Sequence, residues 1–164
     1  MNALAVRPLA ADDRAWADAQ LRASWGGTIM ATRGRLHDLG ASPGFVATLG
    51  GARIALATYR LASLGCELLS LDSLREGQGA GTALLAAVAD AARAAGCRRL
   101  WPITTNDNTR ALRFYQRRGF RLAAPHRDAV AAARLLKPTI PLLGDDDIPI
   151  RDEMELELPL GGKG

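Results

Sequence analysis

The sequence predicts an α/β fold with a mixed sheet flanked by helices, and three patterns in the chain indicate it. An apolar run at 66–74 leads through a glycine-rich turn into an Ala- and Leu-rich helix, and a second apolar run follows at 98–104. This strand–helix–strand spacing is typical of a βαβ unit, whose two strands are parallel. Apolar segments on both sides of Gly50-Gly51 predict an antiparallel hairpin. Strict alternation in Glu153–Leu158 predicts a half-exposed strand.

The first third of the chain predicts strands and two short helices. Residues 3–9 form the first expected strand, and residues 14–24 form a helix that begins after two aspartates, where negative charge is favourable. Residues 33–39 predict a short second helix that ends at Gly40. Residues 45–49 and 54–61 are the two strands of the hairpin.

The rest of the chain continues the alternation of strands and helices. A helix is expected over 79–95, with Gly96 as a left-handed cap at its end. Asn106, Asp107 and Asn108 are expected to cap the next helix. That helix extends to residue 118, and a strand follows at 120–123. The tail predicts a helix at 128–136, a Pro-rich loop at 138–152 and a strand at 153–158 placed last in the sheet, antiparallel to its neighbours. The acidic triplet inside the loop, Asp145–Asp147, is interpreted as a solvated turn.

Length and composition exclude several classes of protein. The 164 residues suit one domain with a sizeable core, and 48% apolar with 23% charged residues are ordinary values for a globular protein. The net charge is +4, but the arginines are scattered, so we expect no nucleic-acid partner. No secretory signal and no run of about 18 apolar residues is present, which predicts a cytoplasmic protein with no membrane partner.

Cysteine and histidine usage predicts no metal and no disulfide. Cys66 and Cys97 each stand at the start of a predicted strand, where buried, reduced thiols are expected. His37 and His126 are isolated in the sequence, and no metal-ligand spacing occurs.

The turn at residues 75–82 is the strongest functional signal. Glycines at 77, 79 and 81 leave its amide groups accessible, and the helix behind it adds the positive end of its dipole, which together favour a phosphate or pyrophosphate. A nucleoside triphosphate loop would need a lysine, and none precedes Lys137. A dinucleotide fingerprint would need a glycine where Thr82 stands. A tight turn without any ligand stays open as an alternative.

Two sequence motifs, the glycine-rich turn and a second motif that follows it at residues 108–120, resemble those of the Gcn5-related N-acetyltransferase (GNAT) superfamily. Glu76, Gly79 and Gly81 align with the acetyl-CoA motif Q/R-x-x-G-x-G/A, although Glu76 departs from its first position. Residues 108–120 match N-x-x-A-x-x-x-Y-x-x-x-G-F. The resemblance spans residues 4–124 and implies the family fold, in which a mostly antiparallel sheet of about seven strands contains a splayed parallel pair. We therefore expect a single domain over 1–164, with this core followed by an extra helix, the Pro-rich loop and a last strand at 126–160.

The resemblance also implies a cofactor, acetyl-CoA, and the residues that hold it. Backbone groups of Leu71 and Ser73 would pair with the pantetheine arm, and the Leu71 amide would polarise the thioester carbonyl. Asn108 would also bind the pantetheine arm. The expected cofactor-binding residues are thus Leu71, Ser73, Gln78, Gly79, Ala80, Gly81, Thr82, Asn108 and Tyr115.

Two side chains are the expected catalytic groups. Tyr115 would protonate the departing thiolate, because a phenol with a pKa of about 10 carries its proton at neutral pH. The alternative is that Phe114 and Tyr115 only pack their helix on the sheet. Glu67 is the expected base, acting through water, with Asp72 as second choice. A surface carboxylate without a catalytic role is the alternative for Glu67.

The predicted reaction is transfer of the acetyl group of acetyl-CoA to a primary amine by direct attack. The acceptor would be a small-molecule or peptide amine. In the family, helices in this part of the chain cover one side of the acceptor site, so the resemblance implies that Trp25 and Arg33 line it. The alternative is a catalytically silent acyl-CoA-binding or regulatory module on the same fold. A homodimer is a further open alternative, because an exposed final strand would offer an edge to a second copy.

Overall fold

The computed structural model describes residues 3–161 and divides into two compact units. The first unit comprises Met1–Thr28, Leu39–Leu100 and Pro159–Gly164, and the second comprises Ile29–Asp38 and Trp101–Leu158. The strands are β1 (Leu4–Pro8), β2 (Ile29–Thr32), β3 (Arg35–Asp38), β4 (Gly44–Leu49), β5 (Ala52–Ala62), β6 (Gly65–Ser73), β7 (Arg99–Thr105), β8 (Arg121–His126) and β9 (Glu153–Pro159). The α-helices are α1 (Arg14–Trp25), α2 (Ala80–Ala94), α3 (Thr109–Arg117) and α4 (Ala129–Leu136).

The strand order confirms the predicted mixed α/β class. Seven strands follow the order β1-β4-β5-β6-β7-β9-β8, mostly antiparallel with one parallel pair, and β2 and β3 form a separate two-stranded sheet. Within residues 3–161 no helix has the length and apolar character needed to cross a membrane. The prediction that residues 1–164 form a single domain stays a prediction.

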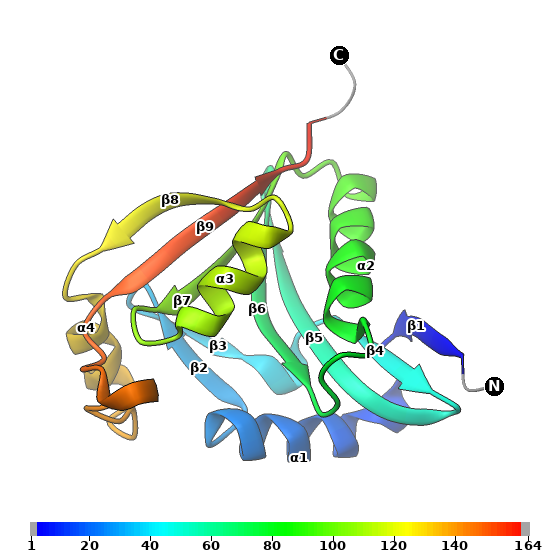
Figure 1. Cartoon of the computed structure of the whole chain (residues 1–164), viewed down its shortest axis with the longest axis horizontal. Helices are drawn as coiled ribbons and strands as arrows, with labels where there is room; N and C mark the ends of the chain where they lie inside the picture. Colours follow the sequence, from blue (N-terminus) through cyan, green and yellow to red (C-terminus); the bar gives the residue numbers. More distant parts are fainter. Residues whose placement is uncertain (1–2, 162–164) are drawn as a thin grey trace. The chain divides into compact units, whose positions relative to one another are not determined.

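The first unit is an antiparallel meander with two helices. β1 pairs with β4, β4 with β5 and β5 with β6, as the sequence predicts for the hairpin around Gly50 and Gly51. Both glycines have positive φ, 58° and 83°, which suits the short turn between twisted strands. α2 lies against β4, β5 and β6, and its buried Leu84 and Val88 stand one helical turn apart on that face (Figure 1). The core of this unit therefore anchors the strand and the helix on either side of the glycine turn.

The two cysteines belong to this core. Cys66 and Cys97 are buried free thiols, which confirms the prediction. Burial raises the pKa of Cys66 to about 12, so this sulfur stays protonated at neutral pH. A protonated, buried thiol has a structural role rather than a reactive one.

The second unit contains the β2–β3 hairpin, α3, α4 and the antiparallel pair β8–β9. Arg121 of β8 stands opposite Glu157 of β9, and α4 contacts β2. The segment Trp101–Leu158 and the β2–β3 hairpin thus belong to one compact unit, although they are far apart in the sequence.

Two sequence predictions are wrong in this unit. Residues 33–39 do not form a helix: Arg33 and Gly34 both have left-handed φ, 52° and 69°, and they form the turn of the β2–β3 hairpin. The Arg33 amide donates to both carboxylate oxygens of Glu153, at 3.2 and 3.0 Å, a long-range contact that the local pattern does not reveal. β9 is not last in the sheet but lies between β7 and β8. The edge strand that would have supported a homodimer is therefore not β9.

Candidate active site

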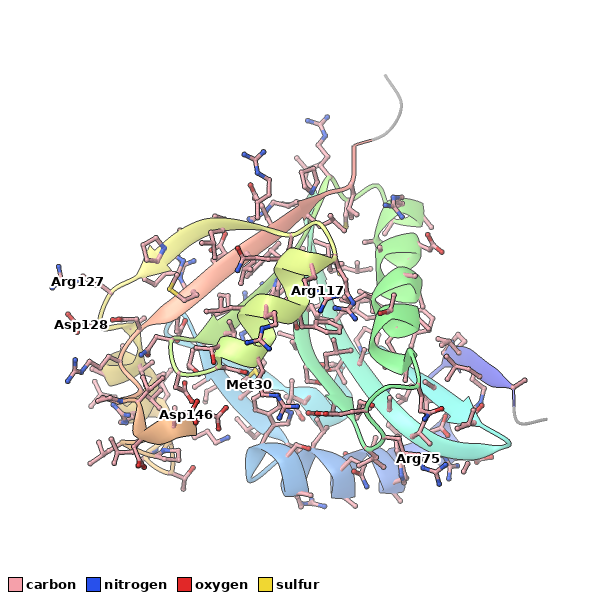
Figure 2. The ribbon with its side chains drawn as sticks, viewed as in Figure 1. Met30, Arg75, Arg117, Arg127, Asp128 and Asp146 are labelled. Carbon is pink, nitrogen blue, oxygen red and sulfur yellow. The ribbon has the colours of Figure 1, made fainter. Side chains whose placement is uncertain are left out.

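The turn between β6 and α2 is exposed and depends on glycine for its backbone. Gly77 and Gly79 have φ values of 80° and 77°, in the left-handed region that L side chains rarely adopt. A β-carbon at either position would meet nothing within 4 Å, so conformation rather than crowding requires glycine there. Arg75 lies in the same exposed turn (Figure 2).

The start of α2 is suited to an anion. Gly79 is its N-cap residue and supplies no side-chain hydrogen bond, and the first turn carries no acidic residue. A helix that begins in this way offers backbone N–H groups and the positive end of its dipole to a ligand. The residues predicted to bind a diphosphate occupy this segment, and that role stays a prediction: Gln78, Gly79, Ala80, Gly81 and Thr82.

β6 changes its pairing just before the residues expected to contact the cofactor. Leu68 pairs with Tyr59 and Ser70 pairs with Thr58, so Leu69 is an extra residue in the ladder. Such a bulge bends its strand and redirects the side chains that follow. Beyond the bulge Leu71 is half-buried and Ser73 is exposed. The hydroxyl group of Ser73 donates to the Arg75 carbonyl at 2.9 Å and so holds the beginning of the turn.

The two carboxylates of β6 are in different environments. Glu67 is 2% exposed, and its Oε1 accepts a hydrogen bond from Arg60 Nη2 at 2.8 Å in a largely buried ion pair. Asp72 is half-buried near the glycine turn. Burial raises the pKa of Asp72 to about 6, although hydrogen bonds from Trp25 and Ser24 act in the opposite direction. A carboxylate with this pKa is mostly ionised at pH 7 and still accepts a proton readily.

A contact that the sequence does not predict holds Asp72 in place. Trp25, the last residue of α1, donates from its indole Nε1 to Asp72 Oδ2 at 2.8 Å. The two residues are 47 positions apart, and the only sequence signal was a tryptophan at the end of a helix. Trp25 is 37% exposed, so its ring also offers an apolar surface beside the carboxylate.

Asn108 and Tyr115 lie in the second unit, on α3. Asn108 Oδ1 accepts from the Ala111 amide at 3.1 Å and caps the helix, as predicted. A hydrogen bond from Asn108 to a cofactor would therefore come from Nδ2. Tyr115 is 7% exposed and contacts the Phe120 ring, with centroids 5.2 Å apart. Phe114 is more exposed and lies under the Arg118 guanidinium at 3.7 Å, so Tyr115 is the inward-facing member of the pair.

Arg33, expected near the acceptor, is engaged within the second unit. Its guanidinium Nη1 lies 2.9 Å from Glu155 Oε1 and 2.8 Å from His126 Nε2. The predicted residues Leu71 to Thr82 thus share the first unit with Trp25, while Asn108, Tyr115 and Arg33 belong to the second. Within residues 3–161 no group of three or more His, Cys, Asp or Glu side chains is arranged to hold a metal ion.

Comparison with known proteins decides the family. Residues 13–120, which include the glycine turn and α3, match the family model for the Acetyltransferase (GNAT) family. The chain belongs to the GNAT acetyltransferase family. The uncharacterized protein YdhI of Bacillus subtilis (strain 168) is 44% identical over 131 residues, which is 79% of this GNAT chain and 82% of YdhI.

Solved structures share the fold. The yncA protein of Salmonella typhimurium, solved with its cofactor acetyl-CoA, superposes with a TM-score of 0.70 at 18% identity and covers 99% of this chain and 96% of that one. The ribosomal-protein-S18-alanine N-acetyltransferase of Escherichia coli superposes with a TM-score of 0.66 at 18% identity over 99% and 97% of the two chains. These likenesses confirm the GNAT fold of the chain.

Proposed function

We propose that this protein transfers the acetyl group of acetyl-CoA to a primary amine by direct attack. The observation that carries the proposal is the uncapped start of α2 behind the left-handed Gly77–Gly79 turn, in a chain of the GNAT family. The solved yncA structure with acetyl-CoA supports the choice of cofactor. We place the protein in the cytoplasm.

The turn and β6 hold the cofactor in this proposal. Backbone groups from Gln78 to Thr82 bind the diphosphate, and the backbone of Leu71 and Ser73 pairs with the pantetheine arm, as does the Asn108 amide group. The Leu71 N–H donates to the thioester oxygen, where negative charge develops as the amine attacks. Because Gly77 and Gly79 carry no side chains, the diphosphate can approach the peptide groups directly.

Asp72 replaces Glu67 as the proposed base. Glu67 is held by Arg60 in its ion pair, whereas Asp72 has a pKa raised by burial to about 6 and follows Leu71 directly. Asp72 removes a proton from the acceptor amine, the amine nitrogen bonds to the carbonyl carbon, and the carbon–sulfur bond breaks. Tyr115 then gives its phenolic proton to the departing thiolate. The products are the acetylated amine and coenzyme A.

A silent acyl-CoA-binding module is the second candidate function. The observation that favours it is Glu76, an exposed carboxylate at the position where the family motif has Gln or Arg. A negative charge beside a bound diphosphate weakens binding or alters its geometry. Such a module would bind acetyl-CoA without consuming it in the presence of amines.

The acceptor is proposed only as a class. The S18-alanine N-acetyltransferase acts, by its name, on an alanine of a ribosomal protein, and this supports a peptide amine. A small-molecule amine fits the same chemistry.

The test measures binding and turnover separately. Calorimetry with acetyl-CoA reports binding, and thiol release with a panel of peptide and small-molecule amines reports transfer. We expect both signals. Binding without thiol release across the panel would favour the silent module, and absence of binding would reject both.

A further inference from the structure

An acidic loop in the second unit, Gly144–Asp147, carries three consecutive aspartates on the surface. Asp145, Asp146 and Asp147 are all exposed. Asp146 and Asp147 have φ values of 55° and 58°, a backbone conformation that side chains disfavour. Figure 2 labels Asp146 in this loop. Neither the solvated-turn interpretation nor the proposed transfer reaction accounts for the group that lies beneath it.

That group is Asp107, a carboxylate turned toward the acidic loop. The residue is 6% exposed, and its Oδ2 accepts a hydrogen bond from the Asp145 amide at 3.2 Å. A β-carbon on Gly144 would overlap the same Oδ2, so the loop backbone lies directly on the carboxylate. Asp107 Oδ1 is buried and has no hydrogen-bond partner in the part of the chain that the structure describes. A buried carboxylate oxygen without a donor is costly, so a donor from outside the chain would stabilise it.

The chemistry of the cluster selects an ammonium group over a metal ion. Among residues 3–161 these four carboxylates form no ion pair with Lys or Arg, and no arrangement of three acidic ligands suits a metal. A metal ion needs several ligands at fixed distances. An ammonium group needs only acceptors and negative charge, and it donates up to three hydrogen bonds.

We propose that Asp107 and the acidic loop form a subsite for the distal ammonium group of an acceptor with two or more amines. The proposal rests on the proposed function, because it names the class of amine that the transferase takes. Asp107 immediately precedes Asn108, one of the proposed cofactor contacts, so the subsite adjoins that part of the site in the second unit. The Gly144–Asp145 segment lies on Asp107 Oδ2, and a distal ammonium that reaches Oδ1 would supply the donor that this second oxygen lacks.

The experiment compares 1,4-diaminobutane with butylamine. Both have a four-carbon chain, and only the diamine carries a second, charged amino group. In the wild type we expect kcat/KM for the diamine to exceed that for the monoamine by about tenfold or more. The ratio falls toward one in Asp107→Asn and in the triple variant that combines Asp145→Asn, Asp146→Asn and Asp147→Asn. Asp128→Asn is the matched control, because Asp128 is exposed, belongs to the same unit and has the same left-handed φ of 58° as Asp147.

Direct binding keeps the subsite testable without turnover. Calorimetry with spermidine should show binding to the wild type and to the Asp128→Asn control, and a loss of about tenfold or more in the triple variant. Thermal melting and acetyl-CoA binding verify that each variant is folded. If the triple variant is folded and its spermidine affinity is unchanged, the subsite is wrong.

The outcomes separate this proposal from the proposed function. Equal turnover of both amines would overturn the subsite and leave acetyl transfer in place. No thiol release, together with no acetyl-CoA binding, would overturn the proposed function, and the spermidine measurement would still decide the subsite. Binding of Mg²⁺ or Ca²⁺, but not spermidine, that the triple variant loses would overturn the ammonium assignment.

Discussion

The turn between β6 and α2 and the acidic loop before β9 both contain exposed left-handed residues, but they use different residue types. In the turn these residues are Gly77 and Gly79, which adopt positive φ at little cost. In the acidic loop they are Asp146 and Asp147, which adopt it against the preference of their side chains. The turn thereby presents bare backbone N–H groups, and the loop presents carboxylates. One region is suited to a phosphate and the other to a cation.

This difference matches the two substrates of the proposed reaction. The proposed cofactor is a polyanion that backbone groups can bind without side chains, and its proposed site consists of glycines and a helix start. An amine that carries charge is recognised by carboxylates, which have to be side chains. Two carboxylates are exceptions, Glu76 in the turn and Asp72 on β6 just before it, and the chemistry is assigned to Asp72.

Substitution of Asp72 tests that assignment and has the largest expected effect. Asp72→Asn removes the proton acceptor, and we expect kcat/KM to fall by about 10²- to 10⁴-fold at pH 8. The measurement is thiol release at subsaturating amine, with acetyl-CoA affinity measured in parallel. Asp90→Asn, on the exposed face of α2 in the same unit, should be unaffected. A large loss in Glu67→Gln with normal activity in Asp72→Asn would return the role of base to Glu67.

Tyr115→Phe tests whether the second unit contributes chemistry and not only binding. Removal of the phenolic proton should lower kcat by about 10²-fold, because the thiolate then leaves unprotonated. The control is Tyr59→Phe, since Tyr59 is the other tyrosine of the chain and is half-buried in the first unit. Equal rates for Tyr115→Phe and wild type across the pH range would leave Tyr115 with packing as its only role.

Gly79→Ala tests whether the turn between β6 and α2 needs a residue without a side chain in order to bind acetyl-CoA. A methyl group at a left-handed N-cap strains the turn and stands where the diphosphate approaches, so acetyl-CoA affinity should fall by about tenfold, or about 1.4 kcal/mol. Gly96→Ala is a matched control at the other end of α2: its φ is 81°, and a β-carbon there also meets nothing within 4 Å. Isothermal titration with acetyl-CoA compares the two. A similar loss in both variants would assign the effect to instability of α2 instead of ligand contact.

The same contrast explains what the sequence could predict. The βαβ unit, the hairpin at Gly50-Gly51 and the cap at Asn108 depend on residues close together in the chain, and the structure confirms them. The sequence predicts a helix where β2 and β3 form a hairpin, because the contact that holds Arg33 comes from Glu153, 120 residues away. The position of β9 was missed for a related reason, since alternation shows that a strand exists but not which strands flank it.

In the candidate site too, features with a local sequence signature could be predicted, and features that depend on long-range packing could not. The glycine turn has a local signature, so the residues from Gln78 to Thr82 could be proposed from spacing and resemblance. The environment of each carboxylate is a property of the packed chain: Glu67 meets Arg60 across two strands, and Asp72 meets Trp25 from a helix 47 residues earlier. Their order as candidate bases therefore reverses once the fold is known.

The pH profile of activity gives the smallest effect and tests the hydrogen bond between Trp25 of α1 and Asp72 of β6. With a pKa of about 6, Asp72 loses its charge as pH falls through that value, so kcat/KM should decline on the acid side of pH 6. The Trp25 hydrogen bond lowers the pKa of Asp72, so Trp25→Phe should move this acidic limb to higher pH. A hydrogen bond worth about 1 kcal/mol corresponds to a displacement of less than about one pH unit.

The same group gives a stability slope of predictable sign. Because the pKa of Asp72 is higher in the folded chain than its usual 3.8, the folded state binds more protons between about pH 4 and 6. The contribution of Asp72 to stability is therefore largest below pH 4 and declines as pH rises through 6. Asp72→Asn should remove that decline in chemical denaturation curves measured from pH 4 to 7. If this slope persists in Asp72→Asn, it belongs to another group, and an acidic limb of activity that Trp25→Phe leaves unmoved does not belong to Asp72.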